Sequence, residues 1–193
     1  MPRTRAEMIE ETRAKLLATA RESFRRAGYA GTSMDDLTAS AGLTRGALYH
    51  HFGDKQGLLA AVASQIDDEM EQRLQAISRT APDAWSALRE RCRAYLAMAA
   101  EPDIRRIVLQ DARAVLGPAD AISQARCTAS LATLLRTLMD QGDLRPADPH
   151  ALARMLHGGL DESAFWIAGD TGEDRLTLAL QALDVLLQGI RLP

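Results

Sequence analysis

The side chains best suited to contact another molecule stand together between positions 44 and 51. The guanidinium of Arg45 can make a bidentate pair with guanine, and the methyl group of Ala47 can touch a thymine methyl group. The imidazole of His50 is a further base-reading candidate. Gly46 has no side chain, so a helix carrying it can lie deep in a groove. This combination indicates recognition of base edges in the DNA major groove.

Two short helices are needed to present these side chains. Met34, Leu37 and Ala41 recur at the spacing of one helix face. We expect Thr32 to cap this first helix, with Asp35 three residues later completing a capping box. The connection that follows then decides how the second helix is held.

That connection is three residues long. Gly42 can take the left-handed conformation that ends a helix, and Thr44 can cap the next one. With Leu48 turned inward, an advance of about 100° per residue turns Gly46 and His50 outward. Two amphipathic helices joined by so tight a turn are typical of a helix-turn-helix DNA reader, whose second helix enters the major groove.

The charge of the chain is distributed unevenly. Its net charge is −3, but residues 1–56 hold nine Lys and Arg against seven Asp and Glu, a net charge of +2. Residues 57–193 hold fourteen against nineteen, a net charge of −5. A basic amino-terminal segment suits phosphate contacts, and DNA would repel the acidic remainder. An ordinary solvated surface remains the alternative explanation.

Composition favours a soluble, all-helical chain. Of 193 residues, 47% are hydrophobic and 4% aromatic, and no alternating run of β-branched residues predicts a strand. Cys92 and Cys127 are far apart and outside any C-x-x-C pair, so neither a disulfide framework nor a zinc site is indicated. No apolar run is long enough for a signal segment or a bilayer span. We therefore expect a cytoplasmic protein that is not embedded in a membrane.

Glycine and proline divide the chain into helices. Gly28 is expected to stop the first helix, and a long helix capped by Asp54 should end before Pro82. We expect the first helix at about residues 7–27. Beyond the long helix, we expect further helices near residues 83–100, 103–115, 119–141, 149–168 and 173–190.

The last two helices carry more apolar surface than one subunit can easily cover. The final helix is apolar nearly all round, so one of its faces is expected to pack against a second copy. Gly158 and Gly159 in the preceding helix would let another helix approach closely. The residues expected to dimerise are Leu152, Leu156, Gly159, Leu160, Leu176, Leu180, Leu183 and Leu187. Burial of these helices in a monomeric core is the alternative.

Residues 24–58 resemble the N-terminal motif of the TetR family of bacterial transcriptional regulators. The matching residues are Phe24, Gly28, Tyr29, Thr32, Ala41–Thr44, Gly46, Leu48, Tyr49, His51, Phe52, Lys55 and Leu58. The resemblance implies an all-α homodimer with a three-helix, helix-turn-helix DNA-binding domain. It also implies a larger C-terminal helical domain that binds an inducer and dimerises through its last two helices. On that basis we expect the two domains at residues 1–56 and 57–193.

The resemblance also implies contacts to the DNA backbone. In the family pattern, the matching positions hold phosphates through hydroxyl, imidazole and ammonium donors. They are Thr32, Ser33, Thr44, Tyr49, His51 and Lys55. Tyr49 could instead be a half-buried packing residue. No metal site is expected at His50 and His51, because neighbours on a helix diverge and no suitably spaced carboxylate or thiol accompanies them.

Candidate ligand contacts lie between helices of the larger domain, where apolar side chains and a few polar ones could form a cavity. They are Trp85, Met98, Leu109, Arg113, Cys127, Leu131, His157, Asp161, Phe165 and Trp166. Plain core packing is the alternative for each apolar member, and His157 would also suit a core or interface position. Cys127 could act as a redox sensor, although nothing strongly electropositive beyond Arg126 accompanies it.

An enzyme is not predicted. The chain has no G-x-S-x-G, no Walker loop and no H-E-x-x-H, and the adjacent acids Asp161 and Glu162 diverge on a helix. No cofactor is expected either. A helical interaction module that merely imitates a DNA reader is a third class of function, against which the basic first helix and Arg45 argue.

The sequence thus predicts a homodimeric regulator that binds a palindromic operator in double-stranded DNA and is released by a small-molecule inducer. Repression of transcription is the expected outcome of binding. An activator, a dual regulator and a ligand-independent DNA binder are the alternatives.

Overall fold

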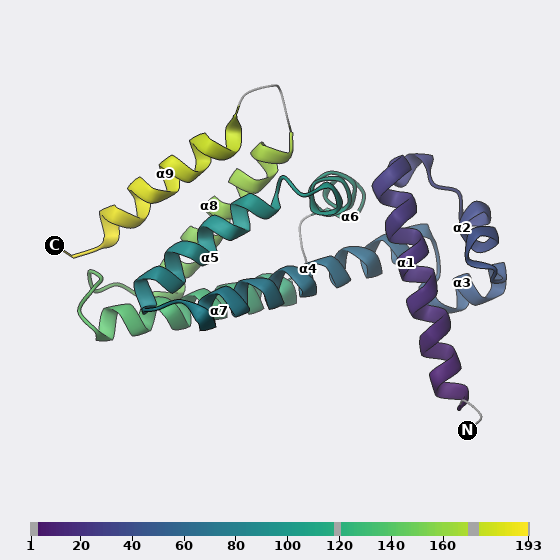
Figure 1. The fold of residues 1–193 in the computed structure, drawn as a ribbon, viewed down its shortest axis with the longest axis horizontal. Coiled ribbons are helices and arrows are strands. Elements are labelled where there is room, and N and C mark those ends of the chain that lie inside the picture. Colours follow the sequence, from purple (N-terminus) through teal and green to yellow (C-terminus); the bar gives the residue numbers. More distant parts are fainter. Residues whose placement is uncertain (1–3, 118–120, 170–173, 193) are drawn as a thin grey trace. The chain divides into compact units, whose positions relative to one another are not determined.

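The computed structural model describes residues 4–117, 121–169 and 174–192. Over these residues the chain forms nine α-helices and one π-helix, and the β pairing there is one isolated bridge between Leu144 and Arg191 (Figure 1). The predicted all-α fold is confirmed. None of the described helices combines the length and apolarity that a membrane span requires. The chain divides into two compact units, residues 1–66 with 102–117 and residues 67–101 with 118–193.

The first unit is built around α1 (Arg5–Gly31), which packs against α2 (Met34–Ala41) and α3 (Arg45–Phe52). Thr4 caps α1, because its hydroxyl accepts a hydrogen bond from the N–H of Glu7 at 3.2 Å and the Glu7 carboxylate accepts from the N–H of Thr4. The buried face of α1 holds Leu16, Leu17, Ala20 and Phe24. This apolar face fixes α1 as the support of the helix-turn-helix pair.

Gly28 interrupts α1 near its carboxyl end. Its φ of 69° and ψ of 174° are non-helical, and the helix resumes as far as Gly31. Glycine is essentially the one residue that adopts this backbone region without strain. The predicted break at Gly28 is confirmed, while the continuation beyond it is a difference from the prediction.

The turn between α2 and α3 has the predicted geometry. Gly42 is left-handed, with φ 63° and ψ 36°, and its N–H donates to carbonyl oxygens of α2. The hydroxyl of Thr44 accepts from the N–H of Ala47 at 3.2 Å and so caps α3. The short turn therefore holds α3 at a fixed angle to α2.

The predicted cap of α2 is wrong, because Ser33 rather than Thr32 performs that role. The Ser33 hydroxyl accepts from the N–H of Asp35 at 3.2 Å. Thr32 lies one residue earlier, is only 4% exposed, and donates its hydroxyl to the carbonyl oxygen of Gly28 at 2.8 Å. That hydroxyl holds the end of α1 and is not directed at α2.

The long helix α4 (Lys55–Thr80) contributes to both units, since the division falls after Ile66. Asp54 caps it as predicted, accepting from the N–H of Gly57 at 2.7 Å. The later part of α4 belongs to the second unit, whose other helices are α5 (Ala84–Met98), α7 (Ala121–Asp140), α8 (Pro149–Ala168) and α9 (Arg175–Ile190). α5 packs against α7, α8 and α9, and α7 lies along α8 (Figure 1).

The segment predicted as one helix at 103–115 is mostly a π-helix. η1 (Ile104–Ala112) has the wider turn in which each N–H bonds five residues back, and α6 (Arg113–Leu116) continues it. Ile104 and Ile107 are buried, and η1 packs against α1 within the first unit. Long π-helices are rare, and π turns often occur at functional sites.

Candidate functional site

The recognition helix α3 turns its predicted reading residues to solvent. Leu48 is completely buried, so the opposite face of α3 points away from the core of the first unit. Arg45, Gly46 and His50 are exposed there, and Ala47 is half-buried beside them. This orientation agrees with the one that helix periodicity predicts. DNA contact by these four residues stays a prediction.

Arg45 has a partner within the protein. Its guanidinium forms an ion pair with the carboxylate of Asp35 in the first turn of α2, and both side chains are more than half exposed. The hydrogen bond to Asp35 raises the pKa of Arg45 above its ordinary value, so the guanidinium stays charged. An exposed pair is weak. Arg45 can therefore exchange Asp35 for a guanine edge.

The hydroxyls of Ser33 and Thr44 stand at the amino-terminal ends of α2 and α3, where both residues are exposed. Backbone N–H groups and the helix dipole favour a phosphate at such ends. Tyr49 is 51% exposed, so part of its ring packs against the protein and part is accessible, and phosphate contact stays a prediction. Thr32 is buried, so its hydroxyl reaches a phosphate only by leaving the carbonyl of Gly28.

The other two backbone candidates lie beside aromatic rings. Nζ of Lys55 is 4.4 Å from the centre of the Tyr29 ring, a cation–π contact. The imidazole of His51 is half-buried, with its ring centre 5.9 Å from that of Phe52. Contact with phosphate stays a prediction for Lys55 and His51.

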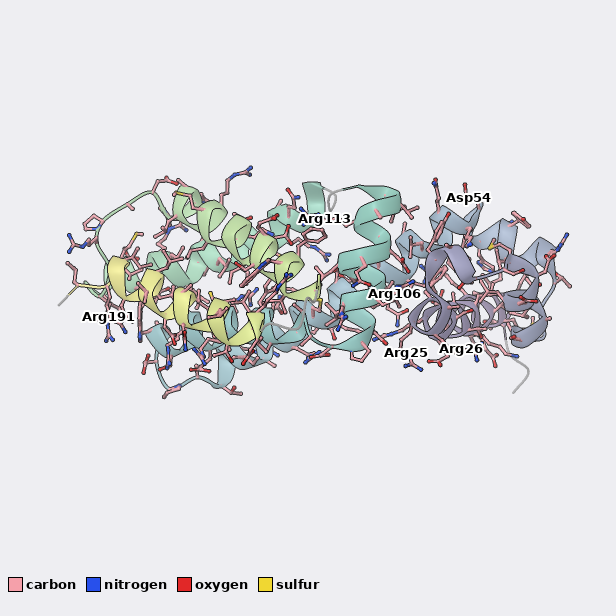
Figure 2. All side chains as sticks on the ribbon, turned by 90° about the horizontal axis from the view of Figure 1, so that it is seen from above. Arg25, Arg26, Asp54, Arg106, Arg113 and Arg191 are labelled. Atoms are coloured by element: carbon pink, nitrogen blue, oxygen red, sulfur yellow. The ribbon has the colours of Figure 1, made fainter. Side chains whose placement is uncertain are left out.

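A polar junction, which sequence reasoning missed, joins α1 to η1 inside the first unit. The N–H of Tyr29 donates to Oδ2 of Asp111 at 2.7 Å, and Nε of Arg106 lies 3.5 Å from the same oxygen. The guanidinium of Arg106, labelled in Figure 2, fills the space beside Gly28, where an added Cβ would overlap Nη2. The glycine at position 28 was a usable sequence signal for a close approach. Nothing in the sequence indicated that Arg106 is the side chain that approaches it.

A second link in this junction uses Asp103. Its Oδ2 accepts from Nε of Arg21 at 2.6 Å, and Nε of Arg25 is 3.8 Å from Oδ1. Arg21 and Arg25 belong to the basic amino-terminal segment, so part of the positive charge expected at DNA is engaged with η1 instead. The junction ties the position of α1 to that of η1.

The second unit encloses a small cavity between α4, α5, α7 and α8. Its lining consists of Glu71, Leu74, Arg91, Cys92, Tyr95, Cys127, Leu131, His157 and Leu160. Three predicted ligand residues, Cys127, Leu131 and His157, are therefore brought together. Asp161 does not line the cavity, but it accepts a hydrogen bond from the hydroxyl of the lining residue Tyr95 at 3.1 Å. Sequence reasoning missed Arg91 and Glu71, because nothing in their local pattern distinguishes them from surface charges.

The remaining ligand candidates lie elsewhere. The guanidinium of Arg191 lies over the Trp85 ring, 4.6 Å from its centre, and Phe165 and Trp166 are each 39% exposed. Met98 is buried but does not line the cavity. Leu109 and Arg113 lie on η1 and α6, within the first unit. No group of three or more potential metal ligands occurs among the described residues.

The residues expected to dimerise are divided by the packing of the second unit. Leu160, Leu183 and Leu187 are buried within it, Gly159 is exposed, and the others are half-buried. The outward apolar face of α8 and α9 is formed by other residues, which are 49–76% exposed. They are Met155, Leu178, Val185 and Leu186.

The chain matches two family models. Residues 16–62 match the model described as "Bacterial regulatory proteins, tetR family", and residues 85–190 match "Tetracyclin repressor-like, C-terminal domain". The two matches together cover the helix-turn-helix region and most of the second unit.

Relatives and solved structures extend this similarity over the whole chain. The transposon Tn10 TetC protein of Escherichia coli is 28% identical over 79% of this chain and 78% of its own length. The HTH-type transcriptional repressor BepR of Brucella suis is 27% identical, with 100% of this chain and 98% of the relative aligned. The crystal structure of a TetR-family transcriptional regulator from Pectobacterium atrosepticum is 61% identical, with a TM-score of 0.93 and 99% of both chains covered.

Proposed function

Because the chain belongs to the TetR family of transcriptional regulators, we propose that it represses transcription as a homodimer on a palindromic operator and is released by a small-molecule inducer. This family consists of regulators and not of enzymes. The proposed DNA-binding domain comprises residues 1–56, and the proposed ligand-binding and dimerisation domain comprises residues 57–193. Both would act in the cytoplasm.

The observation that carries the proposal is the exposed face of α3. Arg45, Gly46 and His50 stand on it with Ala47 at its side, opposite the buried Leu48. These residue types suit major-groove base edges. Ser33 and Thr44 supply hydroxyls and helix ends for the flanking phosphates. In a dimer, two such helices separated by about 34 Å would read half-sites one helical turn apart.

The outward face of α8 and α9 supports a homodimer. Met155, Val185 and Leu186 are 76%, 73% and 64% exposed, and large apolar side chains so exposed favour burial against another surface. Gly158 and Gly159 have open space where a Cβ would stand, so a facing helix can approach α8 closely. A twofold arrangement would bury this face on both subunits at once.

Repression is favoured over activation by the similarity to BepR, whose name describes a repressor. The similarity is modest in identity but spans the whole chain. An activator or dual regulator would present the same DNA-binding surface, so promoter position decides among these outcomes.

The α1–η1 junction supports a route for the ligand response. A change in η1 would be transmitted to α1 through Asp111 and Asp103, since these carboxylates hold Tyr29 and Arg21. A shift of α4 would act in parallel, because this helix begins at Lys55, directly after α3. The inducer must bind the non-reading arrangement more tightly than the reading one, otherwise the equilibrium does not move.

Selection of bound sequences from a random duplex DNA pool tests the proposal. Wild-type protein should enrich a palindrome, and Arg45→Ala protein should lose that enrichment while remaining folded. The selection is repeated over a salt series, since phosphate contacts weaken with salt whatever the sequence. An unenriched pool, with weak and salt-sensitive binding alone, would contradict the proposed sequence-specific regulator.

A further inference from the structure

A buried arginine in the second unit has one guanidinium nitrogen that donates no hydrogen bond to any described residue. The side chain of Arg91, on α5, is 4% exposed, and its Nη2 donates to Oε2 of Glu71 at 2.7 Å. Its Nη1 is equally buried and has no hydrogen-bond partner among the described residues. A buried charged donor is costly without an acceptor. The acceptor must therefore come from outside these side chains.

A molecule bound in the cavity that Arg91 lines can supply that acceptor. It measures about 20 Å³ in this structure, room for about one water molecule. Apart from Arg91, Glu71 and His157, its walls are apolar or weakly polar, formed by leucines, thiols and the Tyr95 ring. An oxygen atom on an otherwise apolar molecule would satisfy Arg91 and bury hydrocarbon against these walls.

The charges around the cavity favour an uncharged occupant. The positive charge of Arg91 is balanced by Glu71, whose second oxygen accepts from Nε2 of Gln75 at 2.9 Å. Burial lowers the pKa of His157, so its imidazole is neutral near pH 7. Burial also raises the pKa of Cys92 to about 12. An anionic ligand would meet the carboxylates of Glu71 and of Asp161, which accepts from the Tyr95 hydroxyl. A cationic ligand would lie against the guanidinium of Arg91, so a desolvated charge of either sign is unfavourable here.

We propose that the effector of this regulator is an uncharged, largely apolar small molecule whose carbonyl-type oxygen accepts a hydrogen bond from Nη1 of Arg91. This inference rests on the proposed function, because it names the ligand class of the proposed inducer site. Since the cavity has room for only about one water molecule here, a larger ligand must part the helices that line it and so favours a different arrangement. Glu71 and Leu74 belong to α4, the helix that begins directly after α3.

The test measures binding of small fragments to the full chain in the absence of DNA. A library holds equal numbers of similar-sized neutral ketones and amides, carboxylates, amines and hydrocarbons, and saturation-transfer NMR detects binding. Arg91→Lys keeps a positive charge beside Glu71, but lysine has a single terminal nitrogen and so lacks the donor that Nη1 provides. Arg89→Lys is the matched control, because Arg89 is on the same helix and pairs with Asp184 without lining the cavity.

Neutral ketones and amides should bind wild-type and Arg89→Lys protein equally, and Arg91→Lys protein at least about tenfold more weakly. The inference is overturned if carboxylates, amines or hydrocarbons bind as well, if no class binds, or if Arg91→Lys changes nothing. Thermal unfolding verifies that each variant folds. If Arg91→Lys does not fold, the charge-free double variant Glu71→Gln/Arg91→Gln replaces it, with the same expected loss.

Failure of this inference and failure of the proposed function give different results. Binding of the wild-type chain to the selected operator is measured in parallel on the same preparation. Operator binding with no fragment binding disproves the ligand site and leaves the regulator intact. Fragment binding with no operator binding disproves the proposed function and leaves the Arg91 site intact.

Discussion

Asp35 and Arg45 form an ion pair across the turn of the helix-turn-helix, joining the first turn of α2 to the first residue of α3. The pair holds the principal base-reading candidate in place before DNA is present. It also cancels one positive charge on the reading face. A DNA group therefore binds Arg45 only if it interacts with the guanidinium more favourably than the water-exposed carboxylate of Asp35 does.

Asp35→Asn should weaken discrimination between operator and random DNA. The substitution leaves the charge of Arg45 without a partner, so the affinity for non-operator duplexes should rise. The dependence of that affinity on salt should steepen by about one phosphate contact. Fluorescence anisotropy with operator and scrambled duplexes measures the ratio of the two affinities. Asp36→Asn, which removes the same charge on the same turn without freeing Arg45, is the control. Equal ratios for both variants would show that the pair has no role in specificity.

Gly28→Ala should destabilise the chain more than Gly42→Ala. Gly28 combines φ 69° with ψ 174°, and the new Cβ would displace the Arg106 guanidinium. Gly42 has an ordinary left-handed conformation, and the nearest side-chain atom to a new Cβ is 3.9 Å away.

We expect a loss of about 1–3 kcal/mol at Gly28 and about 1 kcal/mol at Gly42. Denaturant unfolding gives both values. In an Arg106→Ala background the gap between them should narrow, because one part of the cost at Gly28 is already removed. An unchanged gap would mean that the Arg106 guanidinium adds nothing to the cost of a side chain at position 28.

Val185→Asp combined with Leu186→Asp should yield a folded monomer. Both side chains are exposed on α9, so charge there costs little within one subunit but is expensive in a buried interface. Sedimentation velocity measures the mass. Met8→Asp, at a 49% exposed apolar residue of α1, should leave the dimer unchanged. A dimeric double variant would place the interface elsewhere.

Neither cysteine should act as a redox sensor. Burial is the main cause that raises the pKa of Cys127 to about 11, and Glu71 raises it further. Thiolate at pH 8 should therefore be about a hundredfold scarcer than in an ordinary cysteine. Iodoacetamide labelling of the native chain should be correspondingly slow at both Cys92 and Cys127, and normal after unfolding. Rapid labelling of native Cys127 would restore the redox alternative.

Local chemistry made much of the reader predictable. Gly42, Thr44 and Asp54 act where turn and capping rules place them, and burial of Leu48 follows from periodicity. The role of Thr32 was not predictable from these rules, because the adjacent hydroxyls of Thr32 and Ser33 could each cap α2. Its burial against Gly28 depends on the end of α1, which the capping pattern does not include.

Features that depend on packing between helices were not predictable. Nothing between Ile104 and Ala112 breaks the α-helical pattern, so the π-helix carries no sequence signal. α9 has two apolar faces, and periodicity cannot say that Leu183 faces its own core while Val185 faces outward. Arg91 reads as one of several charges on α5 until tertiary structure buries it beside Glu71.

The most direct measurement is the affinity of wild-type and Arg45→Ala protein for the selected operator and for operators with each G·C pair replaced in turn. The wild type should lose about tenfold or more at one guanine in each half-site, whereas Arg45→Ala should bind weakly and be insensitive to that replacement. Retention of the same guanine preference by Arg45→Ala would contradict the account, since base reading would then not depend on the face of α3 that carries Arg45.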